Sequence, residues 1–133
     1  MSIETTVRYL GAVQFEAECR GHKVFCDQPE ENKGFDEGMT PPEFLLVSLG
    51  TCAAYYAAEY LNKKGLPSAD LKVHVKAEKV KQPARLDQFE VRIAAPGVDM
   101  AAHREGLLAS VQKCLIHNTL HHPPSIAVTA ESA

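Results

Sequence analysis

The sequence predicts an α+β fold in which antiparallel sheets pack on two helices, in the order β-β-β-α-β-β-α-β. Short segments with alternating apolar residues occur in neighbouring groups, and two longer segments carry helix-like apolar patterns. Glycine and proline mark most of the boundaries between them. Hairpins with segregated helices are typical of α+β domains, and the length of 133 residues fits a single domain over 1–133.

Three strands are expected before residue 28. The alternating residues of the first two are Thr5, Val7, Tyr9, Val13, Phe15, Ala17 and Cys19. Gly21 turns the chain into a third strand over 22–27, and the polar segment 28–40 is expected to be a loop. Cys19 and Cys26 are in phase with the apolar residues of their strands, which favours packing roles for both.

A long helix is expected to begin at Pro41, with Thr40 as its N-cap, and to end before Gly65. Apolar residues occupy every face of this helix, which predicts burial on all sides. Because one chain of this size can hardly surround such a helix, a homodimer is expected. The least polar stretch, 44–58, is about 22 Å long as a helix, short of the ~30 Å hydrocarbon core, so no membrane span is expected.

The second half of the chain predicts a strand over 71–77, a partner strand over 89–93, and a helix over 100–114 capped by Asp99. Leu107, Leu108 and Val111 form one apolar stripe of that helix. The segment 116–125 is expected to be a loop, and 126–130 a final strand.

Composition narrows the function classes. With a formal net charge of -3, the chain offers no reason to expect nucleic acid or an anionic membrane as a partner. The absence of a secretory leader pattern predicts a cytoplasmic location. In such a reducing compartment, disulfides tend to be transient and catalytic rather than structural, and no pair of the 4 cysteines has C-x-x-C spacing.

Two segments carry chemistry. GMTPPEFLLVSLGTCAAYYAAEYLNKKGLP, residues 38–67, holds Cys52, and KCLIHNTLHHPPSIAV, residues 113–128, holds Cys114. The first resembles the first cysteine helix of the OsmC/Ohr superfamily of osmotically induced and organic hydroperoxide resistance proteins, and the second is similar to that superfamily's second cysteine segment. The resemblance also implies an intertwined homodimer.

The resemblance implies a thiol peroxidase without a cofactor or metal. Cys52 would attack an organic hydroperoxide as the thiolate, and Cys114 would resolve the resulting sulfenic acid to a disulfide. An external dithiol, a dihydrolipoyl group in the better-studied branches, would then reduce the disulfide. Family members activate the thiolate with an Arg steadied by a Glu, for which Arg20 and Glu43 are the matches here.

Helix geometry constrains how Glu43 can serve Cys52. Nine residues apart on one helix, they lie about 180° apart in azimuth and roughly 13 Å apart along the axis. Glu43 is therefore expected to serve the site of a neighbouring subunit, unless the helix begins after it.

Leu49, Tyr55, Tyr56 and His117 are expected to line an apolar substrate pocket at the thiols, with core packing as the alternative for the first three. One departure from the family is Leu115, which stands where Pro commonly follows the second Cys and is expected to loosen that turn. Two other readings stay open: a zinc site of Cys52, Cys114 and His117, and a dimeric binding module for apolar ligands without turnover.

Overall fold

The computed structural model describes residues 1–132, and the chain forms two compact units. The first unit, Met1–Leu45, contains a three-stranded sheet, and the second, from Leu46 onward, contains a two-stranded sheet and most of the helical residues. The boundary falls inside the long helix. The α+β prediction is confirmed, whereas the single domain over 1–133 stays a prediction.

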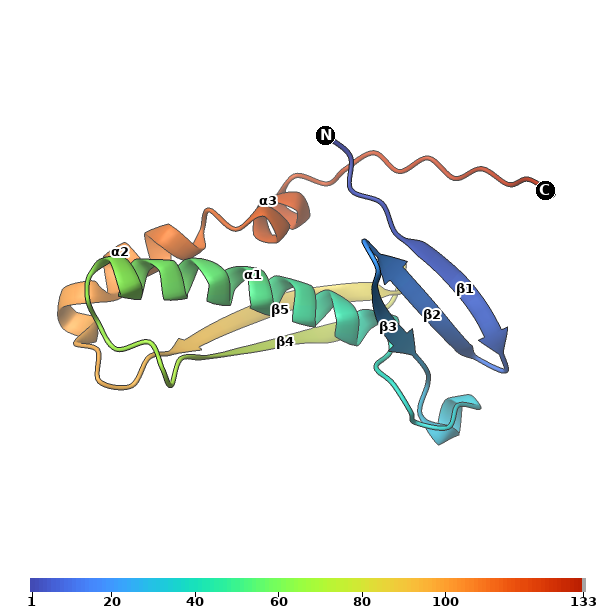
Figure 1. Ribbon diagram of the computed structural model, residues 1–133, viewed down its shortest axis with the longest axis horizontal. Helices are drawn as coiled ribbons and strands as arrows, with labels where there is room; N and C mark the ends of the chain where they lie inside the picture. Colours follow the sequence, from blue (N-terminus) through green and yellow to red (C-terminus); the bar gives the residue numbers. More distant parts are fainter. Residues whose placement is uncertain (133) are drawn as a thin grey trace. The chain divides into compact units, whose positions relative to one another are not determined.

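In the first unit, β1 (Thr6–Gly11), β2 (Gln14–Cys19) and β3 (His22–Cys26) form an antiparallel sheet in chain order, as the sequence predicts (Figure 1). The register places Val7 opposite Ala17 and Ala17 opposite Val24. Because side chains directly opposite share a face, these apolar residues lie together on one side of the sheet. Within the described chain this apolar face remains exposed to solvent at Val7 and Val24.

Asp27, directly after β3, organises the loop that follows. Its side chain is completely buried, and its carboxylate accepts hydrogen bonds from the Gln14 side chain and from the backbone N–H groups of Gln28, Phe35 and Glu37, at 2.7–3.1 Å. Burial alone would raise the pKa of Asp27, but these donors outweigh it and hold the pKa below its ordinary value. The loop 28–38 is therefore wound around one carboxylate.

The same loop contains a short 3₁₀ turn, η1 (Glu30–Asn32), and packs tightly on itself. Gly34 lies against the backbone of Gln28 so closely that a Cβ at this position would overlap the Gln28 carbonyl group. Only glycine fits at position 34, because there is no space for a side chain between this residue and the Gln28 backbone.

Helix α1 (Pro41–Lys63) begins and ends where the sequence predicts. Glu43 Oε1 accepts hydrogen bonds from the N–H and hydroxyl groups of Thr40 at 2.8 and 2.9 Å, which is half of a capping box. The residues buried along α1 form one stripe at a spacing of four: Leu49, Ala53, Ala57 and Leu61.

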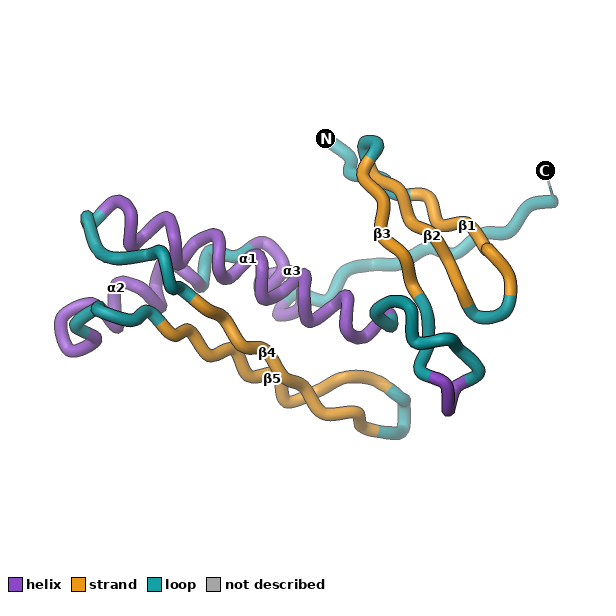
Figure 2. Tube along the Cα trace, turned by 60° about the horizontal axis from the view of Figure 1, so that its bottom comes forward, coloured by secondary structure: helices purple, strands orange, loops and turns teal. Residues whose placement is uncertain are grey.

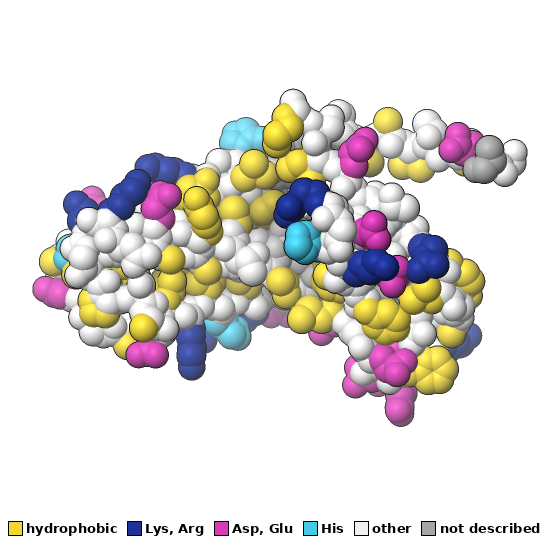
Figure 3. Space-filling view, viewed as in Figure 1, with side chains coloured by type: hydrophobic (Ala, Val, Ile, Leu, Met, Phe, Trp, Pro, Cys, Tyr) yellow, Lys and Arg dark blue, Asp and Glu magenta, His cyan; other side chains and the backbone are white. Residues whose placement is uncertain are grey.

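The expectation that α1 is buried on all sides is not met within one chain. Val47 and Tyr55 are exposed, and Figure 3 shows hydrophobic side chains at the surface of each unit. By length and composition alone α1 could cross a membrane, with 22% of its most apolar stretch buried, a test that core helices of water-soluble proteins also pass. The intertwined dimer stays a prediction.

In the second unit, β4 (Lys72–Val80) and β5 (Arg85–Ala94) form an antiparallel hairpin that runs alongside α1 (Figure 2). Both strands are longer than their alternating patterns predict. Side chains alternate between half-buried apolar and exposed charged residues along the hairpin, so its apolar face is directed at the helices. Gly50 of α1 lies against Val75 of β4, where a larger residue would crowd the strand.

Helix α2 (Met100–Val111) packs against α1. The side chain of Asp99 accepts a hydrogen bond from the N–H of Ala101, which confirms the predicted cap. The Tyr60 hydroxyl lies 3.0 Å from His103 Nδ1, and Ser110 donates a hydrogen bond to the backbone carbonyl of Tyr56. These contacts join the two helices through polar groups at both ends of α2.

Three predictions near the C-terminus are wrong. Helix α2 ends at Val111 instead of Cys114, and most of a further helix, α3 (Leu115–His121), lies in the expected loop 116–125. The expected strand over 126–130 does not form in this chain. Ile126 and Val128 are 80% and 89% exposed, because the described residues offer this extended segment no strand to pair with.

The Asp27 cluster predicts a specific sensitivity to acid. A carboxylate with a lowered folded-state pKa stabilises the protein above its unfolded pKa of about 3.9, and this stability is lost as the pH falls through the folded value. Asp27→Asn should lower the melting temperature by several degrees at pH 7. The variant replaces one carboxylate oxygen with an NH₂ group, which cannot accept the hydrogen bonds that the surrounding N–H groups donate. It should also flatten the acid dependence below pH 4.

Thermal unfolding followed by circular dichroism at several pH values measures both effects. Asp36→Asn, which changes an exposed carboxylate in the same loop, is the control and should keep the wild-type curve. Parallel acid dependence of the Asp27 variant and the wild type would contradict the role of this cluster.

Candidate active site: a pair of thiols beside an apolar cavity

The structure brings together the two cysteines that the sequence singles out. Cys52 lies in the middle of α1 and is half-buried, whereas Cys114 lies between α2 and α3 and is 0% exposed. The side chain of Cys52 is a hydrogen-bonding neighbour of the Cys114 thiol. Both are free thiols, as are Cys19 and Cys26. Two thiols 62 positions apart in the chain are thus in contact.

The surroundings of Cys114 hold it in the protonated form. Burial raises the pKa of the Cys114 thiol, and the neighbouring Cys52 side chain raises it further. The backbone N–H groups of His117 and Ile116 act in the opposite direction without outweighing burial. Because the thiolate is the nucleophile, Cys114 is a poor attacking group at neutral pH.

The start of α3 fixes the position of Cys114. Cys114 is the N-cap of α3, and its Sγ accepts a hydrogen bond from the N–H of His117 at 3.4 Å. Leu115 is consequently the first residue of the helix, a position that also suits proline because its N–H has no partner within the helix. Leu115 therefore starts an ordered helix, and the expectation of a loosened turn is wrong.

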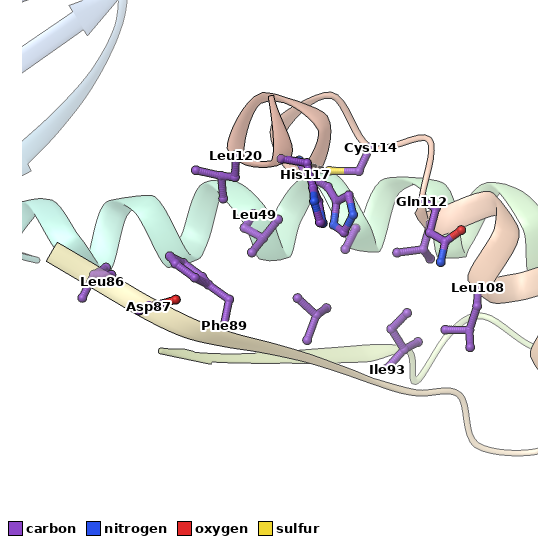
Figure 4. Close-up of a pocket in the computed structure, with 14 residues that line it drawn as sticks. Leu49, Leu86, Asp87, Phe89, Ile93, Leu108, Gln112, Cys114, His117 and Leu120 are labelled. Carbon is purple, nitrogen blue, oxygen red and sulfur yellow. Dashed lines mark hydrogen bonds between the residues drawn. The ribbon is translucent and has the colours of Figure 1, made fainter. Parts of the chain in front are cut away.

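A cavity of about 570 Å³ lies beside the thiol pair, between β5 and the helices (Figure 4). Its apolar walls are Leu49, Ala53, Leu86, Phe89, Val91, Ile93, Leu108, Val111 and Leu120. Asp87, Gln112, Cys114, His117 and His121 complete the lining. The volume and the mostly apolar walls are typical of a site for a small organic molecule.

The expected pocket residues separate into two groups. Leu49 and His117 line the cavity, and Figure 4 shows the His117 ring directed into it beside Cys114. Tyr55, 63% exposed, and Tyr56 are absent from the described lining and lie on other parts of the α1 surface. Tyr56 borders a shallow depression with Leu115.

Arg20 and Glu43 lie in the first unit, whereas both site cysteines lie in the second. Arg20 is exposed at the β2–β3 turn with a positive φ of 54°, and Glu43 caps the start of α1. Because α1 begins at Pro41, Glu43 and Cys52 do share one helix, as the spacing argument assumed. The roles of Arg20 and Glu43 toward Cys52 stay predictions.

A zinc site receives no support from the geometry. Residues 1–132 contain no group of three or more His, Cys, Asp or Glu side chains placed to hold a metal ion. The His117 ring instead packs against that of His121, with centroids 4.5 Å apart and the ring planes tilted by 43°.

Sequence reasoning missed the strand β5 as a wall of the site. The alternation of Leu86, Phe89, Val91 and Ile93 with charged residues indicates an apolar face, but the sequence alone does not say which helices cover it. It also missed His121, which the one-turn spacing from His117 would have placed on the same side, had α3 been recognised as a helix.

The family of the chain follows from comparison with known proteins. The sequence model described as "OsmC-like protein" matches residues 34–129, which is most of the chain and includes both cysteine segments. The chain therefore belongs to the OsmC-like family. No curated protein sequence matches it.

Solved structures share the fold at low sequence identity. An OsmC-like protein from Mycoplasma pneumoniae is 18% identical, with a TM-score of 0.76 over 92% of this chain and 89% of that one. An organic hydroperoxide resistance protein from Elizabethkingia anophelis is 14% identical, with a TM-score of 0.69 over 92% and 90%. One from Legionella pneumophila, named an organic hydroperoxide resistance protein OsmC, is 15% identical, with a TM-score of 0.63 over 90% and 89%.

The contrast between the two thiols predicts a difference in reactivity. With iodoacetamide at pH 7, Cys114 should be alkylated at least about tenfold more slowly than Cys52, because it is buried and its pKa is raised. Peptide mass spectrometry after timed quenching measures both rates in one sample. Equal rates in the folded protein would contradict the protected state of Cys114, and denaturation in urea should remove the difference.

Proposed function

We propose that the protein is a thiol-dependent peroxidase that reduces organic hydroperoxides in oxidative-stress defence. The observation that carries this proposal is the contact between the half-buried Cys52 thiol and the fully buried Cys114 thiol. Two such thiols can be oxidised to a disulfide without a large rearrangement, whereas cysteines used only for packing need no thiol partner. Membership of the OsmC-like family and the names of its structural neighbours support a stress-related redox role.

The proposed reaction has two steps. The Cys52 thiolate attacks the outer oxygen of R–OOH, the O–O bond breaks, and the alkoxide takes a proton to leave as R–OH, so that Cys52 becomes a sulfenic acid. The Cys114 sulfur then displaces the hydroxyl group, which leaves as water after protonation, and the disulfide forms. An external dithiol returns both cysteines to thiols. The half-buried position of Cys52 leaves it open to substrate, and the raised pKa of Cys114 suits a group that reacts second.

Activation of Cys52 requires a positive charge, and we propose that Arg20, steadied by Glu43, supplies it across a homodimer interface. The exposed apolar face of the three-stranded sheet and the exposed faces of α1 support a second copy of the chain as their cover. The unpaired apolar segment 126–130 offers a strand to the same partner. A cytoplasmic location fits the use of free thiols.

Peroxide turnover tests the function directly. The reduced wild type should consume cumene hydroperoxide in the presence of dihydrolipoamide. Cys52→Ser should lower this rate by at least about a hundredfold, because it removes the nucleophile. Cys114→Ser should react once and stop as a sulfenic acid, which dimedone traps at Cys52.

Cys19→Ser is the matched control, because it removes a free thiol that lies in the three-stranded sheet, and it should keep wild-type turnover. Consumption of hydroperoxide by Cys52→Ser at the wild-type rate would contradict the assignment. The apolar cavity also favours one alternative function, a module that binds apolar ligands without turnover. This alternative predicts saturable binding of the hydroperoxide and unchanged thiols in the wild type.

The proposed dimer is tested on the exposed sheet face. Val24→Asn should weaken dimerisation by about tenfold or more, because covering a valine side chain is worth ~1.5–3 kcal/mol. Lys23→Asn changes the adjacent residue on the opposite face of β3 and should leave association unchanged. Sedimentation velocity over a concentration series measures the effect. A monomeric wild type, or equal weakening by both variants, would contradict this interface.

A further inference from the structure

The two thiols differ in their position relative to the cavity. Cys114 forms part of the wall of the 570 Å³ cavity, whereas Cys52 is absent from its described lining. Cys52 is instead half-buried on α1, near Tyr55 and Tyr56, which lie one turn farther along the helix and outside the cavity. A molecule in the cavity therefore meets Cys114 and not Cys52.

The cavity is also unsuited to activating a nucleophile for peroxide. None of its described lining residues is Lys or Arg, and its one carboxylate, Asp87, accepts hydrogen bonds from the N–H of Gln88 and from Arg85. Peroxide attack needs a thiolate with a stabilising cation close by. The pKa of the thiol that faces the cavity is raised, which disfavours its thiolate.

On this basis we propose that the cavity is the access route of the reductant, an uncharged aliphatic dithiol that attacks Cys114, while the hydroperoxide reaches Cys52 from the α1 side. This inference rests on the proposed disulfide cycle and adds to it the direction from which each reactant arrives. It assigns the walls formed by β5, α2 and α3 to the reductive half of the cycle.

Reduction of the disulfide proceeds through a mixed disulfide at Cys114. A thiolate of the reductant attacks Cys114 Sγ, the Cys52–Cys114 bond breaks, and Cys52 leaves with the electron pair, already in the thiolate form that the next hydroperoxide requires. The second thiol of the reductant then attacks the reductant's first sulfur, which is bonded to Cys114 in the mixed disulfide. Cys114 leaves and takes up a proton. The reductant ends as a cyclic disulfide. Attack on Cys52 instead would release Cys114, the buried thiol whose pKa is raised.

The lining favours one chemical class of thiol. The apolar side chains of β5 and of Leu108 and Leu120 can cover a hydrocarbon chain, and the imidazoles of His117 and His121 are the lining groups able to exchange a proton with sulfur. A peptide thiol with free carboxylates, such as glutathione, would find no lysine or arginine among the described lining residues and would meet Asp87. An aliphatic dithiol should therefore react faster than glutathione.

Narrowing the cavity separates the two half-reactions. Leu108→Trp and Leu120→Trp each replace a leucine side chain of the cavity wall with a larger indole ring. These positions are 46% and 41% exposed and so tolerate the added volume. Leu10→Trp, 42% exposed in β1 of the first unit, is the matched control. The chain has no native tryptophan, so the emission of the introduced residue also reports whether each variant is folded.

The disulfide is formed with diamide and then reduced with dihydrolipoamide, and free thiols are counted by alkylation and mass spectrometry after acid quenching. Both cavity variants should be reduced about tenfold more slowly than the wild type and the control, because access to the attacked sulfur sets the rate. Their oxidation by cumene hydroperoxide, measured on the reduced proteins, should be unchanged.

Two results would overturn the inference: wild-type reduction rates in both folded cavity variants, or an equal loss in the oxidative half, which would make the cavity the route of the peroxide. The reductive measurement needs no hydroperoxide. A wild type that fails to react with hydroperoxide would therefore contradict the proposed function while leaving the reductive result interpretable.

Discussion

The contact between Cys52 and Cys114 is the interaction on which the proposed chemistry of this protein depends. It arises because α1 presents a buried stripe with two alanines, Ala53 and Ala57, whose small side chains allow neighbouring segments to approach the helix closely. Cys114 is carried to that place by the cap of α3 and is screened completely from water. The two thiols differ in burial: Cys114 is buried and its pKa is raised, which keeps it protonated, whereas Cys52 stays partly accessible.

A second constraint is the amount of apolar surface that one chain leaves uncovered. The three-stranded sheet exposes Val7 and Val24, α1 exposes Val47, and the segment 126–130 pairs with no strand within residues 1–132. The proposed second copy of the chain would cover such surfaces, because each copy offers the same sheet face, helix face and unpaired segment. In this account the site thiols belong to one copy, and the residues that activate them come from the other.

The sequence predicted most elements because their signals are local. Asp99 caps α2 as expected, Thr40 directly precedes α1 and donates hydrogen bonds to Glu43, and the alternating residues of β1, β2 and β4 pair as expected. The sequence could not predict features that depend on burial or on contacts between residues far apart in the chain. The role of Asp27 needs donors from three separate parts of the chain, and the cavity needs β5 to meet α2 and α3. The prediction of a strand at 126–130 was wrong because alternating apolar residues indicate a strand but do not show which strand it pairs with.

The most direct test of the account is the fate of the two sulfurs under oxidation. Reduced protein treated with one equivalent of cumene hydroperoxide should lose two hydrogens in its intact mass, and digestion without reductant should yield a peptide pair joined through Cys52 and Cys114. Oxidation of Cys52 to sulfinic acid with Cys114 still a free thiol, or a disulfide that leaves out either residue, would contradict it.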